Sequence, residues 1–449
     1  MKKEDMQIKK KKESALKISI KEGSATSFST GISNSYITPF ALKLSSKEIN
    51  IGLLSAFTGL ISPLAQLFGS RLMDSHARKK IVRVAVFWQA VMWLPLTVLA
   101  VLKYYNLFQS SLIYLLIIFY SIIVALGGIA FPPWFSWMGD LVSNNNRGKY
   151  FAKRNIVTGI SELIAVILGA LILYLLENTF FILFGFGLLF TVSFISRLIS
   201  FSILYRQYSR YPTNVKRYAH SIKTIFKENK NFRSFAYYQL FLNFAIFFAS
   251  PFFAVYMLSE LKFNYFTYMF VSLSGSLFYL LFSSFIGKFS DKYGNVKLLV
   301  IENIFFALNP LLWIFIKSPI LLFFIPGVVT GIANAAAILS FNNFSYDYLT
   351  KKERGIGIAY ANIFAGIGIF AGSIIGGLLL NYNVKIGMMN KFIFIFLIAF
   401  IVRALVAIIF LPKIKEKKKV TKMPSMHLSF IHPFKSISSE IGWVRHVFK

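Results

Sequence analysis

The sequence predicts an all-α polytopic membrane protein with about twelve transmembrane helices in two pseudo-symmetric six-helix halves. Three observations predict this fold. The 449 residues are 56% hydrophobic and only 15% charged, with a mean hydropathy of +0.62. The apolar residues form runs near the ~20 residues that cross a bilayer core. Motifs of the first half of the chain return in the second half at nearly constant spacing.

The apolar runs define the expected elements in chain order. Six runs come first, at residues 23–44, 49–70, 81–103, 111–139, 155–176 and 179–205. Six more follow a polar break, at residues 235–258, 264–287, 296–316, 319–346, 356–381 and 392–412. We therefore expect a basic N-terminal segment at 1–22, a first half at 23–205, a central linker at 206–234, a second half at 235–412 and a basic tail at 413–449. Pro39, Pro251 and Pro310 are expected to kink their spans.

The basic residues indicate the orientation of the chain. Net charge is +32, and Lys and Arg cluster in the N-terminal segment, the central linker, the tail and the loops on the same face. The loops of the opposite face hold Lys43, Lys47, Lys103, Lys262, Lys317, Lys385 and Lys391. This asymmetry predicts that both termini are cytoplasmic, in a multi-pass protein of the cell (plasma) membrane. Because the charges lie between apolar runs, we expect membrane lipid rather than nucleic acid as their partner.

Two short basic loops are the clearest repeat. Asp74 and Asp291 are 217 residues apart, and each lies in a basic loop between apolar runs. Further along, Trp134, Trp137, Asp140, Arg147, Gly148, Ala152 and Asn155 return 207 residues later as Phe341, Phe344, Asp347, Arg354, Gly355, Ala359 and Asn362. Thr38-Pro39-Phe40 returns as Ser250-Pro251-Phe252, and Arg197 returns as Arg403. Four matches in the same order predict a duplicated unit.

The two loops resemble the loop signature of the major facilitator superfamily, Gly-x-Leu-x-Asp-Arg/Lys-x-Gly-Arg/Lys-Lys between the second and third spans. The first copy departs from it at Ser70, Ser75 and Ala77, whereas the second keeps Gly287, Asp291, Lys292 and Gly294. The resemblance covers about 390 residues, from the first span to the twelfth. It implies a secondary transporter that works by alternating access, with a site between the two halves.

The resemblance also implies a cytoplasmic gate. Asp74 would face the region of Arg354, and Asp291 would face the region of Arg147, where an aspartate meets basic side chains and a helix N-terminus. The expected gate residues are Asp74, Arg78, Asp140, Arg147, Asp291, Lys292, Asp347 and Arg354. The alternative is that these are solvated loop charges and helix-end ion pairs that contribute ~0 to 1 kcal/mol.

Glu162 is the expected proton-coupling residue. It lies about two turns into the fifth span, where an acidic side chain costs on the order of 2.5 to 3.5 kcal/mol. The alternative is a carboxylate that is hydrogen-bonded within the bundle. For Glu302, Arg403 and Arg197, the favoured interpretation is structural: snorkelling, or a Glu302–Arg403 pair.

Polar residues on the first, fourth, seventh, tenth and eleventh spans are the expected lining of the substrate cavity. They are Asn34, Tyr36, Gln239, Asn243, Asn334, Asn342 and Asn362. Together they indicate a largely neutral cavity rich in aromatic residues. Each of them could instead join helices by hydrogen bonds worth roughly ~0.6 kcal/mol.

The predicted function is the movement of a small organic solute across the membrane by a proton-coupled secondary transporter. The sequence has no phosphate-binding loop, zinc pair or nucleophile turn, and it has no cysteine. We therefore expect no enzyme activity, no cofactor and no metal, and we expect a monomer. The alternatives are an uncoupled uniporter, a multidrug/proton antiporter, and a transporter-like receptor or lipid-handling protein without solute turnover.

Overall fold

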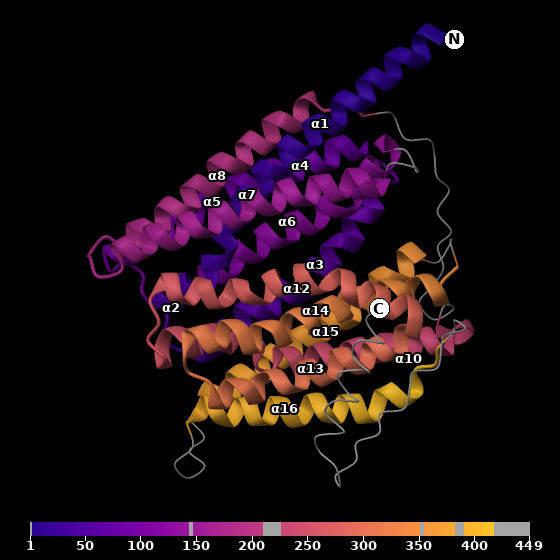
Figure 1. Cartoon of the computed structure of the whole chain (residues 1–449). Coiled ribbons are helices and arrows are strands. Elements are labelled where there is room, and N and C mark those ends of the chain that lie inside the picture. The colour runs from indigo at the N-terminus through magenta and orange to yellow at the C-terminus, as the bar shows by residue number, and fades with distance from the viewer. Residues whose placement is uncertain (1, 143–146, 210–225, 351–353, 382–389, 417–449) are drawn as a thin grey trace. The chain divides into compact units, whose positions relative to one another are not determined.

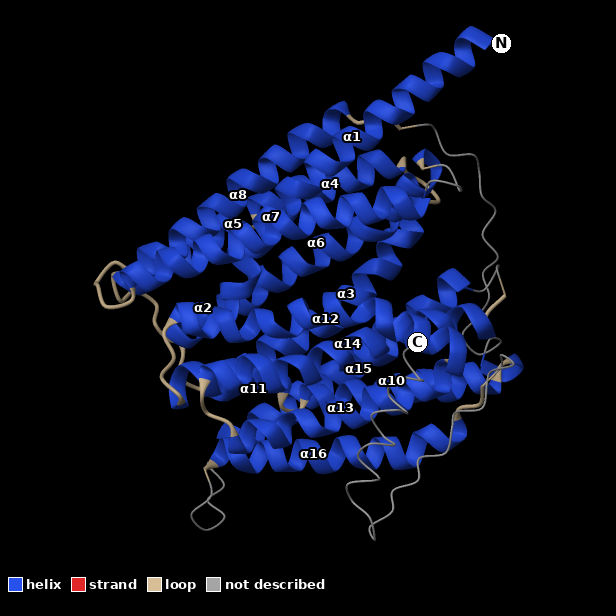
Figure 2. Ribbon diagram, viewed as in Figure 1, coloured by secondary structure: helices blue, strands red, loops and turns tan. Residues whose placement is uncertain are grey.

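The computed structural model describes residues 2–142, 147–209, 226–350, 354–381 and 390–416. Every regular element among these residues is a helix (Figure 2). Eleven of the helical segments in this described part are long and apolar enough to cross a membrane. The predicted all-α polytopic fold is confirmed. The expected first span, residues 23–44, is not among the eleven; it comprises the end of a long helix and two short helical segments.

The elements follow the expected runs closely. The first half contains α1 (Lys2–Ser33), η1 (Asn34–Tyr36), α2 (Ile37–Leu44), α3 (Glu48–Leu72), α4 (Arg78–Val91), α5 (Trp93–Tyr104), α6 (Leu112–Leu141), α7 (Arg147–Leu176) and α8 (Ile182–Arg206). The second contains α10 (Lys230–Phe247), α11 (Ser250–Val255), η3 (Tyr256–Glu260), α12 (Tyr265–Tyr293), α13 (Asn295–Phe315), α14 (Pro319–Tyr348), α15 (Arg354–Asn381), α16 (Lys391–Phe410) and η4 (Leu411–Lys413).

Prolines account for the breaks in the first and seventh spans. Pro39 has no N–H to bond the carbonyl four residues earlier, and the chain passes there from α1 through η1 into α2. Pro251 stands in the same place after α10, which ends at Phe247, four residues before it. The repeated Pro-Phe motif therefore marks equivalent helix breaks in the two halves of the sequence.

The chain divides into two compact units. The first unit joins residues 1–217 with residues 247–269 and 365–392. Within it α1 packs against α7 and α8, and α3 packs against α6 (Figure 1). Glycines permit this close approach, because a Cβ on Gly31 would collide with the main-chain oxygen of Glu162, and one on Gly69 with that of Ile129.

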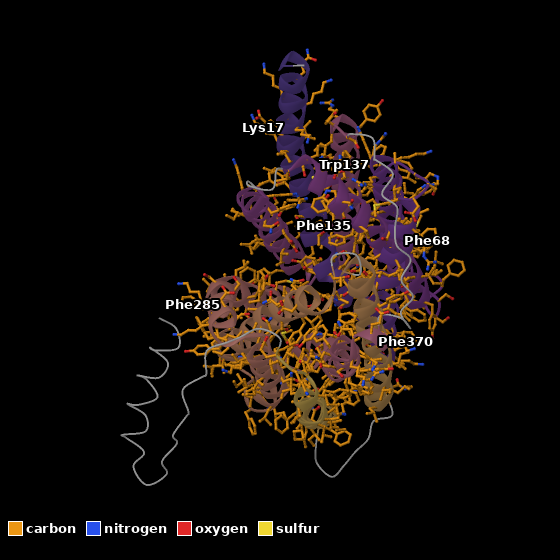
Figure 3. All side chains as sticks on the ribbon, turned by 90° about the vertical axis from the view of Figure 1, so that its right-hand side faces the viewer. Lys17, Phe68, Phe135, Trp137, Phe285 and Phe370 are labelled. Atoms are coloured by element: carbon orange, nitrogen blue, oxygen red, sulfur yellow. The ribbon has the colours of Figure 1, made fainter. Side chains whose placement is uncertain are left out.

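The second unit joins residues 218–246, 270–364 and 393–449. In it α13 packs against α14, and a buried cluster that includes Phe235, Tyr238 and Phe344 forms the core. Across the described residues, large apolar side chains are also exposed. Figure 3 labels three of them, Phe68, Phe135 and Phe285. Exposed phenylalanines on long apolar helices are expected where lipid surrounds the helices.

Candidate functional site

A cavity of about 310 Å³ lies inside the first unit. Its walls come from α1, η1, α3, α4, α5, α6 and α8. Most of its polar lining can both donate and accept hydrogen bonds: Thr26, Ser29, Thr30, Asn34, Ser62, Gln66 and Gln89. Trp93 and Phe131 supply aromatic surface, and Arg197 supplies a positive charge. Such a lining binds small solutes through a few oriented polar groups.

Arg197 is held firmly in the cavity wall. It is 8% exposed, and its Nε donates to Gln89 Oε1 at 2.8 Å. Its Nη2 donates to the same oxygen, and its Nη1 donates to the hydroxyls of Thr26 and Ser200. Gln89 is oriented in turn, because its Nε2 donates to the carbonyl of Ile123 at 2.9 Å. The guanidinium is therefore fixed before any solute binds.

Glu22 lies one helical turn below Thr26 and is 4% exposed. Its Oε1 accepts hydrogen bonds from Thr26 Oγ1 at 2.7 Å and from Ser200 Oγ at 2.9 Å. Arg154 Nη2 lies 3.8 Å from its Oε2. Sequence analysis did not identify Glu22, because its basic neighbours lower the local hydropathy. The spacing of Glu22, Thr26 and Ser29, which places them on one helical face, is the sequence pattern that could have indicated Glu22.

Two of the predicted cavity residues, Asn34 and Tyr36, belong to the first unit but differ in their position relative to the cavity. Asn34 lines the cavity. Tyr36 does not: it is fully buried, donates a hydrogen bond to the carbonyl of Val166 and packs against Gly169. Tyr36 therefore joins η1 and α7, as in the alternative interpretation of these polar residues.

The other predicted cavity residues belong to the second unit. Gln239 is buried, and its main-chain oxygen accepts a hydrogen bond from Asn243 Nδ2 at 2.8 Å. Asn334 and Asn362 are half-buried, and Asn342 is exposed. Their role in a substrate site stays a prediction.

Glu162 is exposed on α7. Asn155 and Gly159 are exposed on the same helix, seven and three residues earlier, which places the three on one helical face. A Cβ added to Gly159 would meet no atom within 4 Å, so the surface beside Glu162 is open. No residue in the described part of the chain forms a hydrogen bond or ion pair with the Glu162 carboxylate that would support the structural alternative.

Two of the predicted gate residues, Asp140 and Asp347, form equivalent contacts, each inside one unit. Arg78, four residues after Asp74, forms an ion pair with Asp140 in the first unit. Asn295, four residues after Asp291, donates to Asp347 Oδ2 at 2.8 Å in the second. The repeat in the sequence therefore corresponds to equivalent side-chain contacts in the two units.

The remaining gate residues are Asp74, Asp291, Lys292, Arg147 and Arg354. Asp74 and Asp291 are exposed, and the Lys292 ammonium lies 5.4 Å from the centroid of the Tyr293 ring. The side chains of Arg147 and Arg354 lie outside the described residues. The expected approach of Asp74 to Arg354 and of Asp291 to Arg147 stays a prediction.

Arg403 corrects the expectation of a pair with Glu302. It is 1% exposed, so it does not snorkel, and it donates to the carbonyls of Ala245, Ile246 and Phe306 at 3.2, 2.9 and 2.7 Å. Glu302 is also buried and accepts a hydrogen bond from Ser340 Oγ at 2.9 Å.

The helix breaks explain why Arg403 binds carbonyls. Ala245 and Ile246 lie in the last turn of α10, where carbonyls have no intrahelical partner. Phe306 lies four residues before Pro310, which has no N–H to offer it. Arg403 therefore donates to carbonyls left without a helical partner at the end of α10 and four residues before Pro310 inside α13.

A contact between α3 and the end of α15 lies within the first unit. Ser55 and Ser373 are joined by a hydrogen bond of 3.2 Å, and Glu48 forms an ion pair with Lys391. A Cβ on Gly52 would collide with the main-chain oxygen of Ser373. We call these residues, which include Lys391 at the start of α16, the α3–α15 contact. It lies nearer the N-terminal end of α3 and the C-terminal end of α15, remote from Leu72, where α3 ends, and from Arg354, where α15 begins.

Comparison with known families decides the classification. The sequence matches the Major Facilitator Superfamily over residues 23–249 and 235–444. The chain belongs to the major facilitator superfamily. It is therefore a multi-pass transmembrane transporter of this superfamily and not an enzyme. No curated protein matches it.

Solved structures of superfamily transporters share its fold at low sequence identity. The nucleoside transporter NupG is 15% identical with a TM-score of 0.67, covering 90% of this chain and 100% of its own. A D-xylose-proton symporter is 13% identical with a TM-score of 0.70, covering 90% and 99%. A POT family transporter in complex with a thioalcohol conjugated peptide is 15% identical with a TM-score of 0.64, covering 89% and 96%. These likenesses concern the fold.

Proposed function

We propose that this superfamily member is a secondary active transporter that moves a small organic solute across the plasma membrane by alternating access, coupled to protons. The observation that carries the proposal is the cavity of the first unit, where hydrogen-bonding side chains and a buried arginine gather among apolar helices. Polar groups inside a membrane bundle are costly and mark substrate pathways.

Alternating access requires contacts that close each face in turn. The α3–α15 contact supports a closure on the face away from the basic loops. The exposed aspartates Asp74, in the turn after α3, and Asp291, in the last turn of α12, support a closure on the basic face. The clustering of Lys and Arg makes that face, with both termini, cytoplasmic.

Glu162 is the residue that exchanges the coupled proton. Its carboxylate is exposed beside Asn155 and Gly159, where a Cβ added to Gly159 would meet no atom within 4 Å. Glu22 and Glu302 are instead buried and hydrogen-bonded. A carboxylate that gains and loses a proton as its surroundings change is the usual basis of proton relays in transporters.

The experiment combines solute binding with a pH comparison. Detergent-purified protein is screened for solutes that raise its melting temperature, at two pH values, and each hit is tested for counterflow in liposomes. We expect a hit whose affinity depends on pH in the wild type, and we expect Glu162→Gln to lose that dependence, since an amide carries no proton.

Glu302→Gln is the matched control, because it makes the same substitution at a buried acid. It is expected to keep the pH dependence. A pH-independent hit that Glu162→Gln leaves unchanged would favour a uniporter, and a solute that binds without counterflow would favour a receptor.

A further inference from the structure

We propose that the cavity of the first unit takes a small organic carboxylate, which Arg197 binds through its guanidinium. This inference rests on the proposed function and adds the chemical class of the solute. It also corrects the expectation of a neutral cavity, because the first unit buries charged groups that sequence analysis had interpreted as structural or had not identified.

The charge near the cavity is the first argument. Arg197, which is buried in the cavity wall, and Arg154, which is half-buried and does not line the cavity, share one negative charge, that of the buried Glu22. The other polar side chains that line the cavity, from α1, η1, α3 and α4, are neutral hydroxyls and amides. A buried charge without a counter-charge is costly. A singly charged anion restores the balance.

The hydrogen bonds of Arg197 are the second argument. A guanidinium has five N–H donors, and Gln89, Thr26 and Ser200 accept from Nε, from Nη2 and twice from Nη1. One Nη2 donor thus remains in a side chain that lines the cavity. A carboxylate oxygen there would form a charge-assisted hydrogen bond, which is about twice as strong as a neutral one.

Glu22 is the internal competitor of this carboxylate. It does not bond Arg197 directly, since the hydroxyls of Thr26 and Ser200 stand between them. Its Oε2 is buried and has no hydrogen-bond donor within the described residues. The negative charge of Glu22 nevertheless weakens the attraction of Arg197 for a second anion. Removing that charge should therefore strengthen binding of a carboxylate solute.

The remaining lining suits the uncharged part of such a solute. Thr30, Asn34 and Gln66 offer donors and acceptors, and Trp93 offers an aromatic surface. Gluconate is a fitting probe, because it joins one carboxylate to a chain of hydroxyls. Glucose is its matched neutral comparison, with the same number of carbon atoms.

The test measures binding by calorimetry to the full-length, detergent-purified protein. Sodium gluconate is titrated at constant ionic strength against sodium chloride, and glucose is titrated separately. We expect saturable binding of gluconate that glucose does not show. Arg197→Gln should weaken it about 10- to 100-fold, as expected for loss of a hydrogen bond to a charged group. Glu22→Gln should instead strengthen it.

The opposite signs of the two variants separate solute binding from a structural role. If Arg197 and Glu22 only stabilise the bundle, both variants weaken binding together. Equal binding of gluconate and glucose, no saturable binding of gluconate, or stronger binding only in Arg197→Gln would overturn the inference. If Arg197→Gln fails to fold, the inference is still tested by comparing gluconate and glucose binding to the wild type and by gluconate binding to Glu22→Gln.

The result of this experiment does not depend on whether the proposed function is correct. Binding is measured without a membrane or a proton gradient, so protein that binds gluconate through Arg197 but shows no counterflow contradicts transport alone. Protein that transports a neutral solute and ignores gluconate contradicts the carboxylate inference alone.

Discussion

Oxidising the double variant Ser55→Cys/Ser373→Cys is expected to stop solute exchange, and reducing it is expected to restore exchange. The two hydroxyls lie 3.2 Å apart, which suits a disulfide after a small adjustment. The natural chain has no cysteine, so no other thiol can interfere. Because alternating access must break the α3–α15 contact, a covalent bond there should hold one state. Counterflow of the solute found by screening measures the effect.

A second cysteine pair provides the control at equal distance. Thr97 and Thr191 are also 3.2 Å apart, but they join α5 and α8 inside the first half of the sequence. Those helices are expected to move together, so the disulfide in Thr97→Cys/Thr191→Cys should leave counterflow intact. Full exchange in the oxidised Ser55→Cys/Ser373→Cys protein would contradict alternating access through this contact.

Arg403→Met is expected to cause a large loss of stability. The side chain keeps its approximate length, but the carbonyls of Ala245, Ile246 and Phe306 lose their donor in a buried place. Each unpaired buried acceptor costs about 1–3 kcal/mol. Relief from burying the guanidinium offsets part of this cost, so we expect a net loss of about 3 kcal/mol. Unfolding by denaturant in detergent micelles measures it.

Pro310→Ala provides the mechanistic control for Arg403. Alanine restores an N–H that can bond the Phe306 carbonyl within α13. In the Arg403→Met background, Pro310→Ala should therefore recover part of the lost stability. A double-mutant cycle measures this coupling. If the two effects simply add, the interpretation of Arg403 as a donor to the carbonyl left by Pro310 is wrong.

The fold was largely predictable because its signals are local. Runs of apolar residues long enough to span a bilayer predicted eleven helical segments that the structure contains. The repeat of Pro39 as Pro251 predicted kinks in equivalent spans, and both positions are helix breaks. The structure added that the first span is interrupted by η1, which hydropathy alone does not indicate because it averages over the break.

The candidate site was less predictable because it depends on contacts between distant residues. Glu48 and Lys391 are 343 positions apart, and no local pattern connects them. Glu22 was assigned to the basic segment, since Lys17 and Lys21 dominate its surroundings in the sequence. Arg403 was expected to snorkel or to pair with Glu302, whereas its partners are main-chain carbonyls at the end of α10 and before Pro310 in α13.

Proton movement during solute influx tests the central claim most directly. Wild-type protein is reconstituted in liposomes that contain a pH-sensitive dye, and the solute found by screening is added outside without an imposed pH gradient. A proton-coupled transporter is expected to acidify the interior as the solute enters, and Glu162→Gln is expected to abolish the acidification. Solute uptake with no change of internal pH in the wild type would contradict the account.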